Sequence, residues 1–95
     1  MKILAIEVEC PHTHPEQMQA YLMSEAAKVW ELYQKEIIRE AYFEKDHHSA
    51  VLIFECENLS EAQAVVRSLP LVEAGLIDFN LLPLIPYDGF ARLFA

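Results

Sequence analysis

Glycine is scarce in this sequence. The two glycines, Gly75 and Gly89, are far apart in a chain of 95 residues. Neither belongs to the closely spaced glycine patterns that form a P-loop or a dinucleotide-binding turn. Nucleotide binding through either motif is therefore excluded, and we expect no cofactor.

Basic residues are also few, with 7 lysines and arginines against 15 acidic residues and a formal net charge of −8. Binding to nucleic acid or to an anionic membrane requires clustered basic side chains. The two cysteines, Cys10 and Cys56, have no CxxC spacing and are interpreted as small buried hydrophobic residues. We expect neither a nucleic-acid nor a membrane partner.

Long hydrophobic runs are missing, since every apolar run is far shorter than the ~20 residues that a membrane-spanning helix needs. At the start of the chain, the carboxylate of Glu7 comes too early for a signal peptide. These features predict a cytoplasmic protein. Its length predicts a single domain, residues 1–95, and its hydrophobic content of 54% suggests a second buried surface.

The order of the predicted elements is βαββαβ. Period-two and helical spacing of the apolar residues, together with capping and breaking residues, define them. Thr13 with Glu16 fits a capping box for the first helix, and Ser60 with Gln63 fits one for the second. The predicted strands are residues 2–10, 37–44, 50–56 and 77–82, and the predicted helices are residues 13–35 and 60–69.

This order is the ferredoxin-like α+β pattern. Right-handed crossovers give an antiparallel sheet with strand order 4-1-3-2 and both helices on one face. The other face is predicted to carry an apolar patch that a monomer would expose to water. We therefore expect a homodimer or higher homo-oligomer with facing sheets, a dimeric α+β barrel, with tail residues 86–95 packed on the partner subunit. The patch is predicted to contain Ile3, Ala5, Val51, Ile53 and Leu82.

The segments Ser68-Leu69-Pro70-Leu71 and Ile77-Asp78-Phe79-Asn80-Leu81-Leu82-Pro83-Leu84 resemble the end of the muconolactone isomerase family. Arg39, Tyr42 and Glu9 agree with that family more loosely. Glu7 stands where the family has a basic residue, and the pair His47-His48 replaces part of its hairpin. The resemblance implies a dimeric or larger α+β barrel with a small-molecule pocket.

Acidic residues form the first candidate site. These residues are predicted to share the uncovered face of the sheet: Glu7 and Glu9 of strand one, Glu55 of strand three, and Asp78 and Asn80 of strand four. Carboxylates in a partly apolar barrel have raised pKa values, so Glu7 or Glu9 is the candidate acid/base for proton transfer next to a carbonyl group. The alternative is that these acids lie in solvent at the barrel mouth and contribute charge alone.

Other residues of this site would orient the ligand. Arg39, Tyr42, Asp78 and Asn80 are the candidate substrate-binding residues, with Arg39 or Tyr42 holding a carboxylate or enolate oxygen. An even number of residues in the hairpin loop would place Tyr42 and Glu40 on the uncovered face. An odd number would place Arg39 there instead.

Two further groups are considered. His12, His14, His47 and His48 are predicted to lie in neighbouring loops, but their spacing matches no specific metal motif, so we predict no metal site. Met18, Tyr21, Met23, Trp30 and Tyr33 recur at helical spacing and are interpreted as core or interface residues, with Trp30 as an oligomer contact or pocket wall.

The sequence therefore predicts a small-molecule enzyme resembling muconolactone isomerase, one that moves a proton within a small carbonyl or lactone compound. The alternative is a non-catalytic module of the same fold that binds a small apolar ligand or assembles with itself. A cavity that contains Glu7 and Tyr42 would favour the enzyme.

Overall fold

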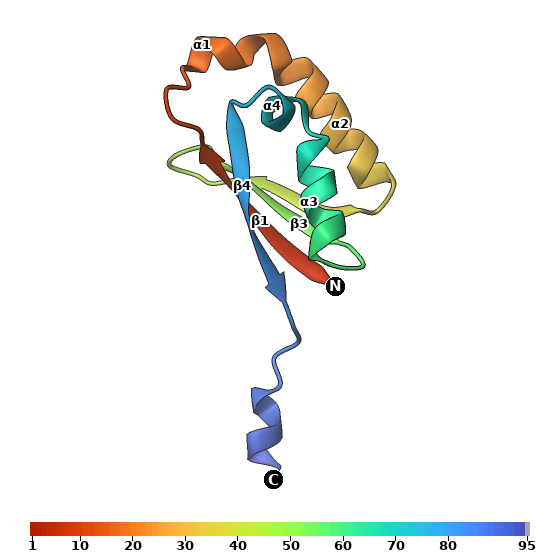
Figure 1. Cartoon of the computed structure of the whole chain (residues 1–95). Coiled ribbons are helices and arrows are strands. Elements are labelled where there is room, and N and C mark those ends of the chain that lie inside the picture. Colours follow the sequence, from red (N-terminus) through yellow and green to blue (C-terminus); the bar gives the residue numbers. More distant parts are fainter. Residues whose placement is uncertain (95) are drawn as a thin grey trace.

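The computed structural model describes residues 1–94. Four strands form one sheet, and α-helices and short 3₁₀ turns connect them (Figure 1). In chain order the elements are β1 Lys2–Glu9, α1 Pro15–Met18, η1 Gln19–Tyr21, α2 Leu22–Gln34, β2 Ile38–Phe43, β3 Ala50–Glu55, α3 Leu59–Arg67, α4 Pro70–Glu73, β4 Ile77–Leu84 and η2 Gly89–Leu93.

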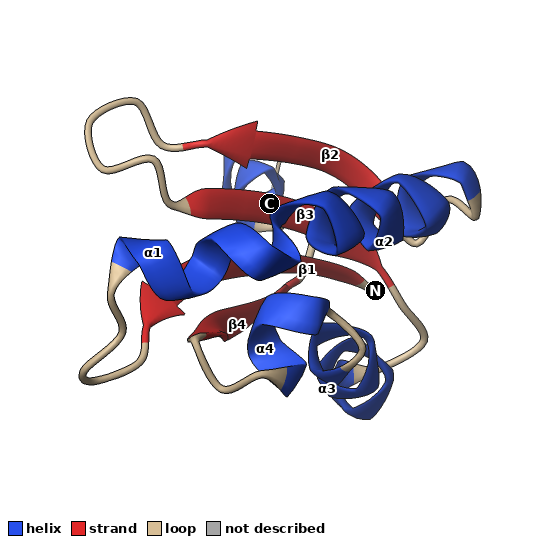
Figure 2. Ribbon diagram, turned by 90° about the horizontal axis from the view of Figure 1, so that it is seen from above, coloured by secondary structure: helices blue, strands red, loops and turns tan. Residues whose placement is uncertain are grey.

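The sheet confirms the predicted fold. Its strand order is β2-β3-β1-β4 and every neighbouring pair is antiparallel. This is the predicted order read from the other edge, and it is the ferredoxin-like α+β arrangement. Helices α1 to α4 all lie on one side of the sheet, with α2 over β2 and β3 and with α3 beside β4 (Figure 2).

The core lies between the sheet and these helices. Ile3 and Ala5 of β1 are fully buried there, opposite Phe54 and Leu52 of β3. The prediction that Ile3 and Ala5 belong to the uncovered face was therefore wrong. In the first half of β1 both alternating sets are apolar, so periodicity alone does not say which set faces the helices. The uncovered face carries Leu4, Ile6, Val8, Val51, Ile53 and Leu82.

The first predicted helix is interrupted. The 3₁₀ turn η1 separates α1 from α2, although the sequence has no proline or glycine there. The N-cap of α1 is His14, whose N–H donates to Oε1 of Gln17 at 2.7 Å. The predicted cap Thr13 instead donates its hydroxyl to the carbonyl of Leu76 at 2.9 Å, which ties this loop to the start of β4.

The second predicted helix begins earlier and is followed by an additional turn of helix. Asn58 is the N-cap of α3, and its Oδ1 accepts the N–H of Glu61 at 2.9 Å. Pro70 does not only end a helix, because it also occupies the first turn of α4. Gly75 follows α4 with φ of 78°, a left-handed conformation that glycine adopts without strain.

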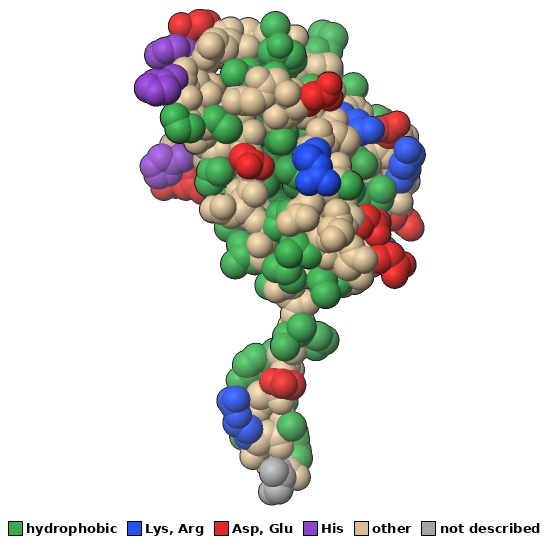
Figure 3. Space-filling model, viewed as in Figure 1, with side chains coloured by type: hydrophobic (Ala, Val, Ile, Leu, Met, Phe, Trp, Pro, Cys, Tyr) green, Lys and Arg blue, Asp and Glu red, His purple; other side chains and the backbone are tan. Residues whose placement is uncertain are grey.

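The chain after β4 projects away from the body as an arm, residues 85–94 (Figures 1 and 3). The molecule measures 56 × 28 × 21 Å, and this arm accounts for its elongated shape. Ile85, Leu93 and Phe94 are each at least three-quarters exposed. The prediction that the tail packs on a partner subunit stays a prediction.

Candidate functional site

A mainly apolar groove of about 710 Å³ lies between α2 and the helix-facing side of the sheet. This volume is within the range of small-molecule sites. Leu32, near the end of α2, is the one residue of that helix that is buried, so the first two turns stand away from the sheet. The groove is lined by Glu7, Met18, Leu22, Glu25, Ala26, Val29, Trp30, Tyr33, Ala41, Tyr42, Phe43, His48, Leu52 and Leu71.

Two carboxylates from different elements line this groove. Glu7 on β1 accepts the N–H of Ala50 on Oε1 at 2.9 Å, at the start of β3. Glu25 on α2 accepts the N–H of Leu71 on Oε1 at 3.0 Å, in the first turn of α4. Each carboxylate is therefore held by a backbone group of a segment distant in sequence.

Glu25 has a perturbed acidity. Partial burial raises the pKa of its carboxyl group above the ordinary value, and the nearby charge of Glu7 raises it further. The hydrogen bond from Leu71 acts in the opposite direction but is outweighed. A carboxyl group whose pKa is shifted toward neutrality is suited to accept and return a proton.

Aromatic rings form the walls of the groove. Trp30 and Tyr33 of α2 stack with centroids 5.9 Å apart. Phe43, at the end of β2, stacks on His48 of the hairpin with centroids 3.9 Å apart. Besides these stacked contacts, Trp30 and Phe43 are 60% and 62% exposed.

Of the predicted acid/base residues, Glu7 lies in the groove and Glu9 does not. Glu9 is the last residue of β1 and is exposed. Tyr42 lines the groove, but its hydroxyl donates to Glu40 at 2.5 Å. The pairing of Tyr42 with Val51 places its side chain on the uncovered face, as the even-loop alternative predicted. Glu7 lies on the helix-facing side with Ile3 and Ala5, so the prediction that Glu7 and Tyr42 share the uncovered face was wrong.

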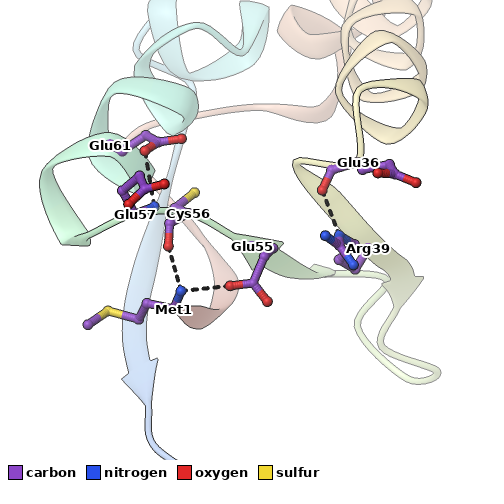
Figure 4. Close-up of polar contacts among 7 residues, drawn as sticks. All are labelled: Met1, Glu36, Arg39, Glu55, Cys56, Glu57 and Glu61. Atoms are coloured by element: carbon purple, nitrogen blue, oxygen red, sulfur yellow. Dashed lines mark hydrogen bonds and ion pairs between the residues drawn. The ribbon is translucent and has the colours of Figure 1, made fainter.

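Arg39 lies outside the groove. Its Nε donates to the carbonyl of Glu36 at 2.7 Å, where the chain leaves α2 (Figure 4). Glu55, at the end of β3, accepts a hydrogen bond from the amino group of Met1 at 2.6 Å (Figure 4). This interaction lowers the pKa of the Glu55 carboxyl group. Arg39 and Glu7 therefore do not line the same groove.

Asp78 and Asn80 line a different hollow, of about 510 Å³, between α3 and the edge strand β4. Arg67 and Gln63 of α3 line it from the other side. The structure therefore divides the predicted substrate-binding residues between two places. Their roles in binding stay predictions.

All four histidines are exposed. His47 lies with Nδ1 3.4 Å from Oε2 of Glu44, which also accepts the backbone N–H of Asp46 and closes the hairpin turn. Within residues 1–94, no three His, Cys, Asp or Glu side chains are grouped so as to hold a metal ion. In the same part of the chain, no helix has the length and apolarity to cross a membrane.

Sequence reasoning missed Glu25. It lies three residues after Leu22 and four before Val29, so it is an acidic residue within the apolar stripe of the helix. A charged residue at such a position is the signal that could have identified it, because charges are rarely placed on a buried stripe without a reason.

Comparison with solved structures finds several matching chains. One of them is a 5-chloro-2-hydroxyhydroquinone dehydrochlorinase from Burkholderia phenoliruptrix in complex with 2,5-dihydroxybenzoquinone. The two chains share 22% sequence identity with a TM-score of 0.65, over 90% of this chain and 94% of the other. This likeness establishes a common fold. No protein-family model matches the sequence, and no curated protein matches it.

Proposed function

We propose that this protein is a small-molecule enzyme that moves a proton within a small carbonyl or lactone compound, in the groove beneath α2. The observation that carries the proposal is the pair Glu7 and Glu25, two carboxylates anchored in an apolar groove, one of them with a raised pKa. Two neighbouring carboxyl groups whose surroundings give them different pKa values are a recurrent arrangement for acid/base catalysis.

In this mechanism Glu25 is the acid/base. Its carboxylate takes a proton from the carbon next to the carbonyl group, and the C–H electron pair becomes part of an enolate. Glu25 then returns a proton to a different carbon of the conjugated system, so the double bond moves and no other reactant is needed. The carboxyl proton exchanges with solvent between the two transfers. Tyr33, which lines the groove, provides a hydroxyl group to donate to the enolate oxygen.

Glu7 has a supporting role in this scheme. Its hydrogen bond from Ala50 holds the carboxylate in place, and its negative charge keeps the pKa of Glu25 high. The dehydrochlorinase of the same fold, solved with a hydroxylated benzoquinone, supports the proposal that this fold can house an unsaturated cyclic carbonyl compound. Glu9, Arg39, Asp78 and Asn80 do not line this groove, and the roles predicted for them stay predictions.

Deuterium exchange tests the proposal. A panel of unsaturated lactones, cyclic ketones and hydroxyquinones is incubated in D₂O with the protein, and deuterium uptake at carbon is followed by NMR. We expect catalysed exchange for one member at least, and a loss on the order of 10²-fold or more in Glu25→Gln. Glu16→Gln, which changes an exposed acid of α1, is the matched control.

The alternative is a non-catalytic ligand-binding module. It predicts that a panel member binds, seen as a change in the fluorescence of Trp30, with no exchange above that of buffer. Equal exchange by the wild type and Glu25→Gln would also contradict the assignment of Glu25.

We further propose that the protein is a homodimer or a higher homo-oligomer with facing sheets. The uncovered face, with Leu4, Ile6, Val51 and Ile53, and the exposed apolar arm support this proposal. Soluble monomers rarely expose apolar surfaces of this extent. Tyr42, Asp78 and Asn80 would then face the space between the two subunits.

A further inference from the structure

The charged residues that line the groove are all acidic. Glu7 and Glu25 are there, and among the described lining residues there is no lysine or arginine. His48 also lines the groove, and its ring stacks on Phe43. Lys28 and Lys35 lie on or just after α2, but both ammonium groups pair with Glu31, at 2.6 and 3.6 Å. These two lysines therefore pair with Glu31 and not with Glu7 or Glu25.

The aromatic rings that line the groove also favour a positively charged ligand. The faces of Trp30, Tyr33 and Phe43 carry the negative part of the ring quadrupole, and these rings are about half exposed or more. A cation over such a face is stabilised, and most strongly over Trp. The interior of the groove is apolar, so water screens charges less than at an open surface.

We infer that the groove selects its ligand by charge, and that it takes small aromatic or unsaturated compounds bearing an ammonium group in preference to carboxylates of the same shape. The inference rests on the proposed function, because it takes this groove to be the substrate site. It adds that the carbonyl substrate carries a protonated amine near the reacting carbon. The net charge of −8 favours the approach of such a cation.

Three ligands that share one carbon skeleton test the inference: benzylammonium, benzyl alcohol and benzoate. Trp30 is the single tryptophan, so its fluorescence reports on the groove, and calorimetry gives an independent dissociation constant. We expect benzylammonium to bind at least ~10-fold more tightly than benzoate at neutral pH, with benzyl alcohol between them.

Variants assign the selectivity to the two carboxylates. Glu7→Gln and Glu25→Gln should each reduce the ratio of benzylammonium to benzoate affinity, whereas Glu16→Gln on the exposed face of α1 should leave it unchanged. Circular dichroism establishes that each variant is folded. Equal affinities for the three ligands, tighter binding of benzoate, or no saturable binding by any of them would overturn the inference.

The ligand-binding and deuterium-exchange experiments test the two proposals separately. Exchange into a neutral ketone with no charge preference would refute the charge selectivity and leave the proton-transfer proposal standing. A clear preference for benzylammonium, with no exchange into any neutral or ammonium-bearing carbonyl compound, would support the selectivity and contradict the catalytic proposal.

Discussion

The carboxylates of Glu7 and Glu25 line one groove and are tied to two different backbone segments. Ala50 donates to Glu7 and Leu71 donates to Glu25, so the start of β3 and the start of α4 set the positions of these groups. The charge of Glu7 contributes to the raised pKa of Glu25. Because both anchors are backbone groups, the pair can be altered one side chain at a time.

The pKa of Glu25 should respond to Glu7. In Glu7→Gln the charge that opposes ionisation of Glu25 is removed, so the pKa of Glu25 should fall. It should stay above the ordinary value, because burial is the larger cause of the shift. NMR titration of the side-chain carboxyl carbon of Glu25 measures this, with Glu16→Gln as the control. An unchanged titration in Glu7→Gln would show that the two groups do not interact.

Protein stability should depend on pH through Glu25. Its folded-state pKa is raised, so the folded protein holds this proton more tightly than the unfolded chain. The associated stability is present below the unfolded pKa, about 4.5, and is lost as pH rises through the folded pKa. Glu25→Gln keeps the oxygen that accepts from Leu71 and has no charge to desolvate.

Urea unfolding of Glu25→Gln and wild type across pH 4 to 8 checks this expectation, using the range in which a raised carboxyl pKa titrates. The stability of wild type relative to Glu25→Gln should decrease as pH rises. A constant difference over the whole range would mean that Glu25 titrates alike in the folded and unfolded chains.

The strand order was predictable from sequence, but the orientation of β1 was not. Helical and alternating spacing, with right-handed crossovers, leave few arrangements of βαββαβ, and the observed sheet is one of them. In β1, Ile3 and Ala5 alternate with Leu4 and Ile6, and both pairs are apolar. The acidic Glu7 and Glu9 suggested an open face for the first set, whereas Glu7 belongs to a groove on the helix side.

The site was harder to predict because it depends on how far α2 stands from the sheet. That spacing follows from the packing of Leu32 at one end of the helix and from the contact of Glu25 with α4, which links residues 46 positions apart. Sequence periodicity contains no information about such a contact. The position of Glu25 inside the apolar stripe was nevertheless visible in the sequence.

The N-cap of α3 should contribute measurably to stability. Oδ1 of Asn58 accepts the N–H of Glu61 at 2.9 Å, which satisfies one of the free donors of the first turn. Asn58→Ala should destabilise the protein by about 1 kcal/mol, whereas Asn58→Asp, which keeps an accepting oxygen, should be close to wild type. Urea unfolding measures both. Ser60→Ala, at the cap position predicted from sequence, should have a smaller effect than Asn58→Ala.

If the subunits associate through the uncovered face, a charge introduced on that face should weaken the association. Ile53 lies on that face beside Leu4, and a carboxylate placed there would be buried without a partner if two sheets pack together. Ile53→Asp should therefore shift the protein from dimer or larger toward the 10.9 kDa monomer in light scattering at micromolar concentration. Glu40→Asp, on the neighbouring strand β2, introduces no new charge and is the control.

The arm provides a second, independent test of association. Its exposed apolar residues, among them Phe90 and Phe94, make it costly to leave in water, so a chain that ends at Pro86 should associate more weakly if a partner covers the arm. Loss of association in Ile53→Asp alone would assign the interface to the sheet, and loss in the shortened chain alone would assign it to the arm. A wild-type protein that stays monomeric at micromolar concentration would refute the homo-oligomer itself.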